Sequence, residues 1–93
     1  MSLVKPISLG QVVKSIAGRD NHQLYLVVGI QGRNIFVSNG KDRSIFNPKK
    51  KNIQHVKILN QIFSPIADKL NHNLKVTDEE IRGVLNIWKK DNL

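Results

Sequence analysis

The chain has 93 residues and a mass of 10.6 kDa, which allows one small hydrophobic core and excludes a large multilayer enzyme. Its composition is typical of a folded soluble protein, and it has no cysteine for disulfides or thiolate metal sites. The longest apolar run, residues 24 to 28, is too short for a membrane span. The net charge of +8 is the unusual property, and it favours a polyanionic partner. We expect a soluble, cytoplasmic protein.

Residues 7 to 58 contain short apolar runs separated by turn residues, a pattern that predicts β-strands. The second run is apolar on both faces, so we expect it to be the central and best buried strand. Five short strands with short connections fit a small, strongly bent antiparallel barrel. The five strands are expected at residues 9 to 16, 23 to 30, 34 to 38, 43 to 47 and 53 to 58.

Two turns are compatible with the sequence between the third and fourth predicted strands. A two-residue turn at Asn39 and Gly40 matches a common hairpin signal, but its register would mix apolar and charged side chains on one face. A four-residue loop, residues 39 to 42, places Phe36 opposite Ile45 instead. We prefer the longer loop because strand register follows the apolar pattern.

The periodicity changes after residue 58 and predicts two helices. Ser64 followed by proline indicates the start of a short helix over residues 64 to 70. Thr77 and Glu80 have the spacing of a capping box, which predicts a second helix over about residues 78 to 90. Its apolar residues form one stripe, which must pack within the chain or bind a protein partner, and we favour packing within the chain. The stripe consists of Ile81, Val84, Leu85 and Trp88.

The positive charge is confined to one part of the chain. Residues 1 to 57 contain ten basic and two acidic residues, whereas residues 58 to 93 contain five of each. Solubility alone does not require such segregation, so we predict two parts with different roles. Residues 1 to 59 are expected to form the basic barrel, and residues 60 to 93 a helical C-terminal appendage.

Catalysis and metal binding have little support in the sequence. The three histidines, His22, His55 and His72, lie in different predicted elements, without a nucleophile signature or the i, i+4 spacing of a metal pair. The acidic cluster at residues 78 to 80 is explained by its place at a helix N-terminus. We expect a protein that is not an enzyme and that needs no metal or cofactor.

Basic residues in three predicted loops are the strongest functional signal. A proline followed by three lysines occupies residues 48 to 51, and a glycine and arginine occupy a turn at residues 17 to 20. Alternate loops of a small barrel meet at one rim, so the three loops could form one cationic ridge facing several phosphates. The candidate RNA-binding residues are Lys14, Gly18, Arg19, Lys41, Arg43, Lys49, Lys50, Lys51 and Asn52.

Residues 10 to 20 (GQVVKSIAGRD), followed by a hydrophobic strand, resemble the KOW motif of ribosomal proteins and transcription elongation factors. Residues 36 to 43 (FVSNGKDR) and 47 to 52 (NPKKKN), with His55, are similar to bacterial KOW-domain RNA-binding proteins related to large-subunit ribosomal proteins of archaea and eukaryotes. The resemblance covers about residues 7 to 59. It implies an SH3-like barrel that binds ribosomal RNA, with the motif's turn at residues 18 and 19.

The sequence therefore predicts a non-catalytic RNA-binding protein, ribosomal or ribosome-associated, that recognises phosphates and RNA shape. Aromatic residues are 5% of the chain and most lie inside predicted strands, so a base-stacking platform is not expected. A protein-interaction KOW module of the transcription-elongation type is the main alternative. A nucleoid-type DNA binder is a weaker one, because neither a basic N-terminal arm nor a helix with a basic face is recognised.

Overall fold

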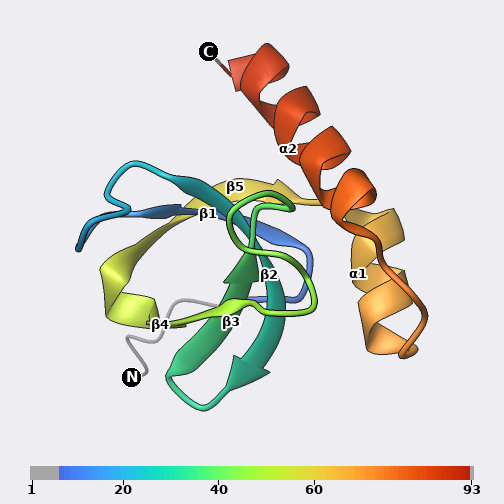
Figure 1. Ribbon diagram of the computed structural model, residues 1–93, viewed down its shortest axis with the longest axis horizontal. Coiled ribbons are helices and arrows are strands. Elements are labelled where there is room, and N and C mark those ends of the chain that lie inside the picture. Colours follow the sequence, from blue (N-terminus) through green and yellow to red (C-terminus); the bar gives the residue numbers. More distant parts are fainter. Residues whose placement is uncertain (1–6, 93) are drawn as a thin grey trace.

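The computed structural model describes residues 7 to 92 and has the expected class, mainly β with C-terminal helices. The five strands form one antiparallel sheet in the order β4-β3-β2-β1-β5. The two helices lie together beside the sheet, away from the turn that joins β4 to β5 (Figure 1). The elements are β1 (Gln11–Ser15), β2 (Leu24–Gln31), β3 (Asn34–Ser38), β4 (Lys49–Asn52), the 3₁₀ helix η1 (Ile53–His55), β5 (Val56–Ile62), α1 (Ser64–Asn71) and α2 (Asp78–Asn92).

Strand β2 is central, as its two apolar faces predicted. Leu26 packs in a cluster with residues of both helices, whereas Tyr25 and Val27 pack in a second cluster on the other face of the sheet. Neighbouring strand β1 divides in the same way, with Val12 in the first cluster and Val13 in the second. The sheet is thus buried on both faces along its middle.

The prediction of a strand at residues 43 to 47 is wrong. Those residues form turns, and the fourth strand is the charged run β4, which the sequence had predicted to be a loop. Lys50 lies opposite Phe36 and Lys51 opposite Ile35, so the predicted pairing of Phe36 with Ile45 is wrong as well. The physical reason is that Lys51 has a buried partner, which lets a lysine occupy an inward-facing strand position.

The last strand is also displaced from its expected position at residues 53 to 58. Residues Ile53–His55 form η1, and β5 runs from Val56 to Ile62, beyond the expected barrel boundary at residue 59. Asn52 begins this turn, since its side-chain oxygen accepts a hydrogen bond from the backbone of Gln54 at 2.9 Å. The sharp change of direction lets β5 pair with β1 on the opposite edge from β4.

The partner of Lys51 is Asp20, in the loop after β1. The Lys51 ammonium lies 2.9 Å from the Asp20 carboxylate and 2.8 Å from the hydroxyl of Ser15 at the end of β1. In a flat sheet, β4 and β1 would lie about 14 Å apart with two strands between them, which is beyond the reach of a lysine. The contact therefore requires a strongly curled sheet, and it ties one edge of that sheet to β1.

The Asp20 carboxylate accepts four side-chain hydrogen bonds, from Ser15, Tyr25, Lys49 and Lys51. Burial alone would raise the pKa of Asp20, but these donors outweigh it and hold the pKa well below its usual range. Burial, reinforced by the hydrogen bond to Asp20, raises the pKa of Tyr25. Both groups therefore keep a fixed protonation state at neutral pH, with Asp20 charged and Tyr25 neutral.

Helix α2 packs onto the sheet through the apolar stripe that the sequence predicted. Ile81 and Leu85 are buried, and Val84 and Trp88 are partly buried in the same cluster. The capping box is confirmed, because the Thr77 hydroxyl accepts a hydrogen bond from the Glu80 backbone at 3.1 Å. In α1 the N-cap is Phe63 rather than Ser64. The stripe of α2 thus packs within the chain and does not form a free partner surface.

Two glycines provide the close contacts on which the helices rest. Gly10 has φ of +81°, and a Cβ there would lie 2.9 Å from the Cβ of Ala67 in α1. Gly40 has φ of +73°, and a Cβ there would collide with the carbonyl oxygen of Asp78 at the start of α2. Glycine is needed at both positions for the backbone conformation and for the space.

Acid should weaken the fold through Asp20. Because its pKa is lowered in the folded state, the stabilisation is complete above the unfolded pKa of about 4 and is lost as pH falls below it. Urea unfolding between pH 7 and pH 2.5 should show this loss. Asp20→Asn should lower the free energy of unfolding by roughly 3 kcal/mol at pH 7 and flatten the acid slope. Asp42→Asn, at an exposed loop position, should keep the wild-type slope, and an unchanged slope in Asp20→Asn would contradict the assignment.

Gly40→Ala should destabilise the fold more than a matched glycine substitution elsewhere. Gly32 also has positive φ, at +60°, but has open space where a Cβ would lie, so Gly32→Ala reports backbone strain alone, about 1 kcal/mol. Gly40→Ala adds the collision with α2 and should lower the free energy of unfolding by about 1 to 3 kcal/mol more than Gly32→Ala does. Equal midpoints in urea unfolding for the two variants would show that α2 does not rest on Gly40.

Candidate nucleic-acid interface

The turn at Gly18 and Arg19 lies exposed at the end of β1. Backbone hydrogen bonds close it, from Asn21 to Gly18 and from His22 back to Ser15. Asp20 was considered a cap of this turn, but its carboxylate faces inward and binds lysines of β4. The Arg19 side chain is exposed, and the ion pairs beneath it hold the turn in a defined place.

The three consecutive lysines of β4 have different environments, which corrects the expectation that they share an exposed loop with no acid nearby. Lys51 is only 8% exposed and pairs with Asp20, so it is structural. Lys49 is half-buried and lies 3.1 Å from the same carboxylate. Lys50 is exposed, and within residues 7 to 92 no carboxylate lies within ion-pair distance of it. Lys50 is therefore the lysine of this run best placed to meet an external anion.

The loop that contains Lys41 and Arg43 is built around the buried side chain of Asn39. Its oxygen accepts hydrogen bonds from the backbones of Lys41 at 2.9 Å and Arg43 at 3.0 Å. Further along, the Asp78 carboxylate accepts hydrogen bonds from the Ser44 hydroxyl and the Ile45 backbone. These bonds lower the pKa of Asp78, and they fasten the loop to the N-terminus of α2.

The structure brings together some, but not all, of the predicted site residues. The ion pairs of Asp20 join β4 to the first turn, and Arg43 lies close enough to influence the pKa of Tyr25, which donates a hydrogen bond to Asp20. Lys41 instead borders a pocket under α2, and Lys14 lies on the sheet opposite Leu24. Lys51 and Asn52 have structural partners. We call the following residues the loop rim: Gly18, Arg19, Arg43, Lys49 and Lys50.

Two features escaped the sequence prediction. Phe46, expected in a strand, is 79% exposed in the loop before β4, so the chain does present an aromatic ring to solvent. Arg82 and Lys89 border the same pocket as Lys41, although their segment has no net charge. Arg82, Asn86 and Lys89 are spaced at i, i+4 and i+7 in the sequence, and this spacing predicts a polar face on the helix. That face corrects the expectation that no helix has a basic side.

The described part of the chain gives no sign of a metal centre or a membrane span. Residues 7 to 92 contain no group of three His, Asp or Glu side chains that could hold a metal ion. In the same residues, no helix has the length and apolar character needed to cross a bilayer.

Comparison with known proteins gives the family. No family model matches the chain. A protein of Bacillus subtilis (strain 168), named "Putative ribosome-binding protein YbzG", is 31% identical over 71 residues, which are 75% of this chain and 96% of the relative. The match thus includes nearly all of the relative's length. The chain belongs to the same family as this Bacillus subtilis protein.

Proposed function

We propose that the protein binds structured ribosomal RNA without catalysing a reaction, mainly through phosphate and shape recognition. The observation that carries this proposal is a set of exposed cations that have no carboxylate partner within residues 7 to 92, in particular Arg19 and Lys50 on the loop rim. The relative's name points to the ribosome as the place of binding. A ribosome-bound protein would reside in the cytoplasm.

We further propose that the sheet is an SH3-like barrel of the KOW type, with the five strands, through the end of β5 at Ile62, as the basic module. Three features support this assignment: the strand order, the 3₁₀ turn between β4 and β5, and the curl that the Lys51 contact requires. The turn at Gly18 and Arg19 occupies the place of the motif's loop.

Three of the loop-rim cations, and the neighbouring Lys51, have different expected contributions. Arg19 offers a planar donor fork on an exposed turn, which suits a phosphate or a base edge. Lys50 offers a point charge on an edge strand. The Asp20 carboxylate offsets part of the positive charge of Lys49, so the attraction of Lys49 for an external phosphate is reduced. Lys51 is buried, so we expect it to hold the turn at residues 18 to 20 against β4 through Asp20 and not to contact RNA.

A protein-interaction module is the second candidate, and Phe46 is the observation that favours it. A ring 79% exposed is the kind of residue that becomes a hot spot in protein interfaces. The same ring can also stack on an unpaired base of an RNA. The surrounding charge favours RNA.

Arg19→Ala and Lys50→Ala should each weaken binding to purified ribosomal RNA by roughly 2- to 5-fold, because each removes one phosphate contact. The double variant should lose both contributions, and its slope of log affinity against log salt should be less steep by about 1.5 to 2. Filter binding at several salt concentrations measures both quantities. Lys75→Ala is the matched control and should bind normally, because Lys75 is exposed in the connection between α1 and α2, which lies on the opposite side of the molecule from the turn between β1 and β2 (Figure 1).

An unchanged affinity in the folded double variant would remove the loop rim from the RNA interface. A different result would support the second candidate: retention of one stoichiometric protein partner from lysate after nuclease treatment and high salt, lost in Phe46→Ala. The proposed function requires the opposite, namely that nuclease and salt release the bound material.

A further inference from the structure

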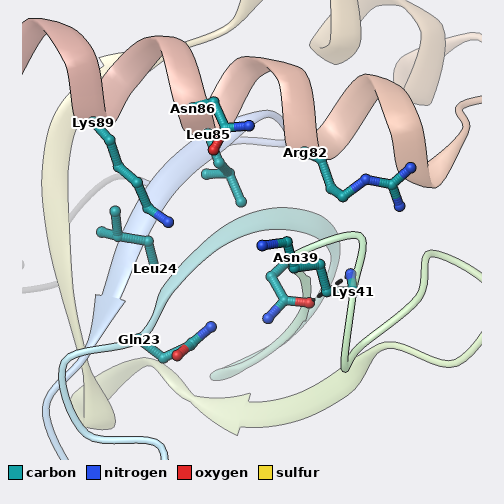
Figure 2. A pocket seen from close by; sticks show the side chains of 8 residues that line it. All are labelled: Gln23, Leu24, Asn39, Lys41, Arg82, Leu85, Asn86 and Lys89. Carbon is teal, nitrogen blue, oxygen red and sulfur yellow. Dashed lines mark hydrogen bonds between the residues drawn. The ribbon is translucent and has the colours of Figure 1, made fainter.

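A pocket lies between α2 and the loop that contains Asn39 and Lys41, and none of the loop-rim residues lines it. Figure 2 shows Lys89 extending from the helix beside Leu24, with Lys41 on the facing loop. Arg82 lies further along the same helix. Three cations from two distant parts of the sequence thus border one small cavity.

The helix contributes one polar face to this pocket. Arg82, Asn86 and Lys89 follow one another at i, i+4 and i+7, so they lie on the same side of α2. Gln23, the residue before β2, adds an amide on the other side of the pocket from the helix. Amide and ammonium donors converging on one cavity suit an anion with several acceptor oxygens.

The lining of the pocket carries an excess of positive charge. None of the described residues that line it is acidic. In the first turn of α2, Asp78 accepts hydrogen bonds from Ser44 and Ile45 and its charge also acts on Arg82, whereas Glu80 pairs with Lys69 at 2.8 Å. Helix α2 is therefore held against the loop by its acidic first turn, while its basic face is left for an external anion.

The pocket is also preorganised. The Arg82 guanidinium donates a hydrogen bond to the Gly40 carbonyl at 2.5 Å, which fixes its position and leaves its other donors available. On the loop side, the Asn39 side chain holds the Lys41 backbone. The backbones of both walls are therefore held in place, so binding needs the ordering of the Lys41 and Lys89 side chains only.

A row of cations continues from the pocket across the sheet. Leu24, which lines the pocket, lies opposite Lys14 on β1, and Lys14 lies opposite Lys57 on β5. Residues directly opposite in neighbouring antiparallel strands have their side chains on the same face. Two like charges in this position are unfavourable unless an anion lies over them, and a phosphate chain would relieve that repulsion.

We propose that this pocket binds a backbone phosphate of RNA and that the Lys14 and Lys57 row receives the phosphates that follow. The inference rests on the proposed RNA-binding function and extends it, because it makes α2 part of the RNA interface. The C-terminal segment then has a binding role in addition to packing, although it has no net charge.

Affinity measurements on charge variants of the full chain test this assignment. Lys89→Ala and Lys41→Ala should each weaken binding to purified ribosomal RNA by about 2- to 5-fold, and Lys89→Glu should weaken it by more than about 10-fold because it places a negative charge in the pocket. Lys90→Ala is the matched control, since Lys90 is exposed on the next residue of the helix and does not line the pocket. It should bind within about 1.5-fold of the wild type. NMR spectra with RNA should show shifts at Gln23 and Asn86.

The outcomes separate this inference from the proposed function. Normal RNA affinity in Lys89→Glu, with a loss in Arg19→Ala, would overturn the pocket assignment and leave RNA binding through the loop rim intact. No ribosomal RNA affinity in the wild type would overturn the proposed function itself. Titration with inorganic phosphate distinguishes the source of the anion: phosphate-induced shifts at Gln23 and Asn86, together with unchanged RNA affinity in Lys89→Glu, would identify a free-phosphate site and contradict an RNA contact.

Discussion

The ion pair between Asp20 and Lys51 is the interaction on which the described architecture depends. It brings β4 next to the end of β1, although two strands lie between them in the sheet. A lysine with 8% exposure would be unfavourable in this position without a partner, so the charged strand and the buried carboxylate require one another. The inward-facing charge on an edge strand also opposes pairing with a second chain. The same contact places the turn with Arg19 beside β4 and Lys49, which organises this part of the proposed RNA surface.

The helices depend on a different constraint, the close approach allowed by Gly10 and Gly40. Once α2 rests on Gly40, its acidic first turn binds the loop at Ser44 and Ile45. The basic side of the helix then faces the cavity beside Lys41. Fold and proposed function are therefore linked at this point: the contacts that hold the helix in place also create the cationic pocket.

The sequence predicted the elements whose residues repeat with a clear apolar period. Strand β3 has the expected bounds, the central place of β2 followed from its two apolar faces, and the α2 stripe packs as its spacing indicated. Strand β4 could not be predicted in this way because its residues are lysines and asparagine. Its place depends on Asp20, far away in the sequence. The pocket was missed for a related reason: net charge was summed along the chain, whereas Arg82 and Lys89 lie on one face of a neutral segment. The exposure of Phe46 was missed because the sequence analysis had placed this residue in the strand wrongly predicted at residues 43 to 47.

The most direct test of the central claim, that uncompensated cations of this protein contact ribosomal RNA, is photo-crosslinking of the full chain on intact ribosomes. Peptides joined to nucleotides would be identified by mass spectrometry. The account predicts RNA crosslinks in the segments that contain Arg19 and Lys50, and in α2 near Lys89, with none at Lys75. Ribosome binding that survives high salt, with crosslinks only to ribosomal proteins and none to RNA, would contradict it.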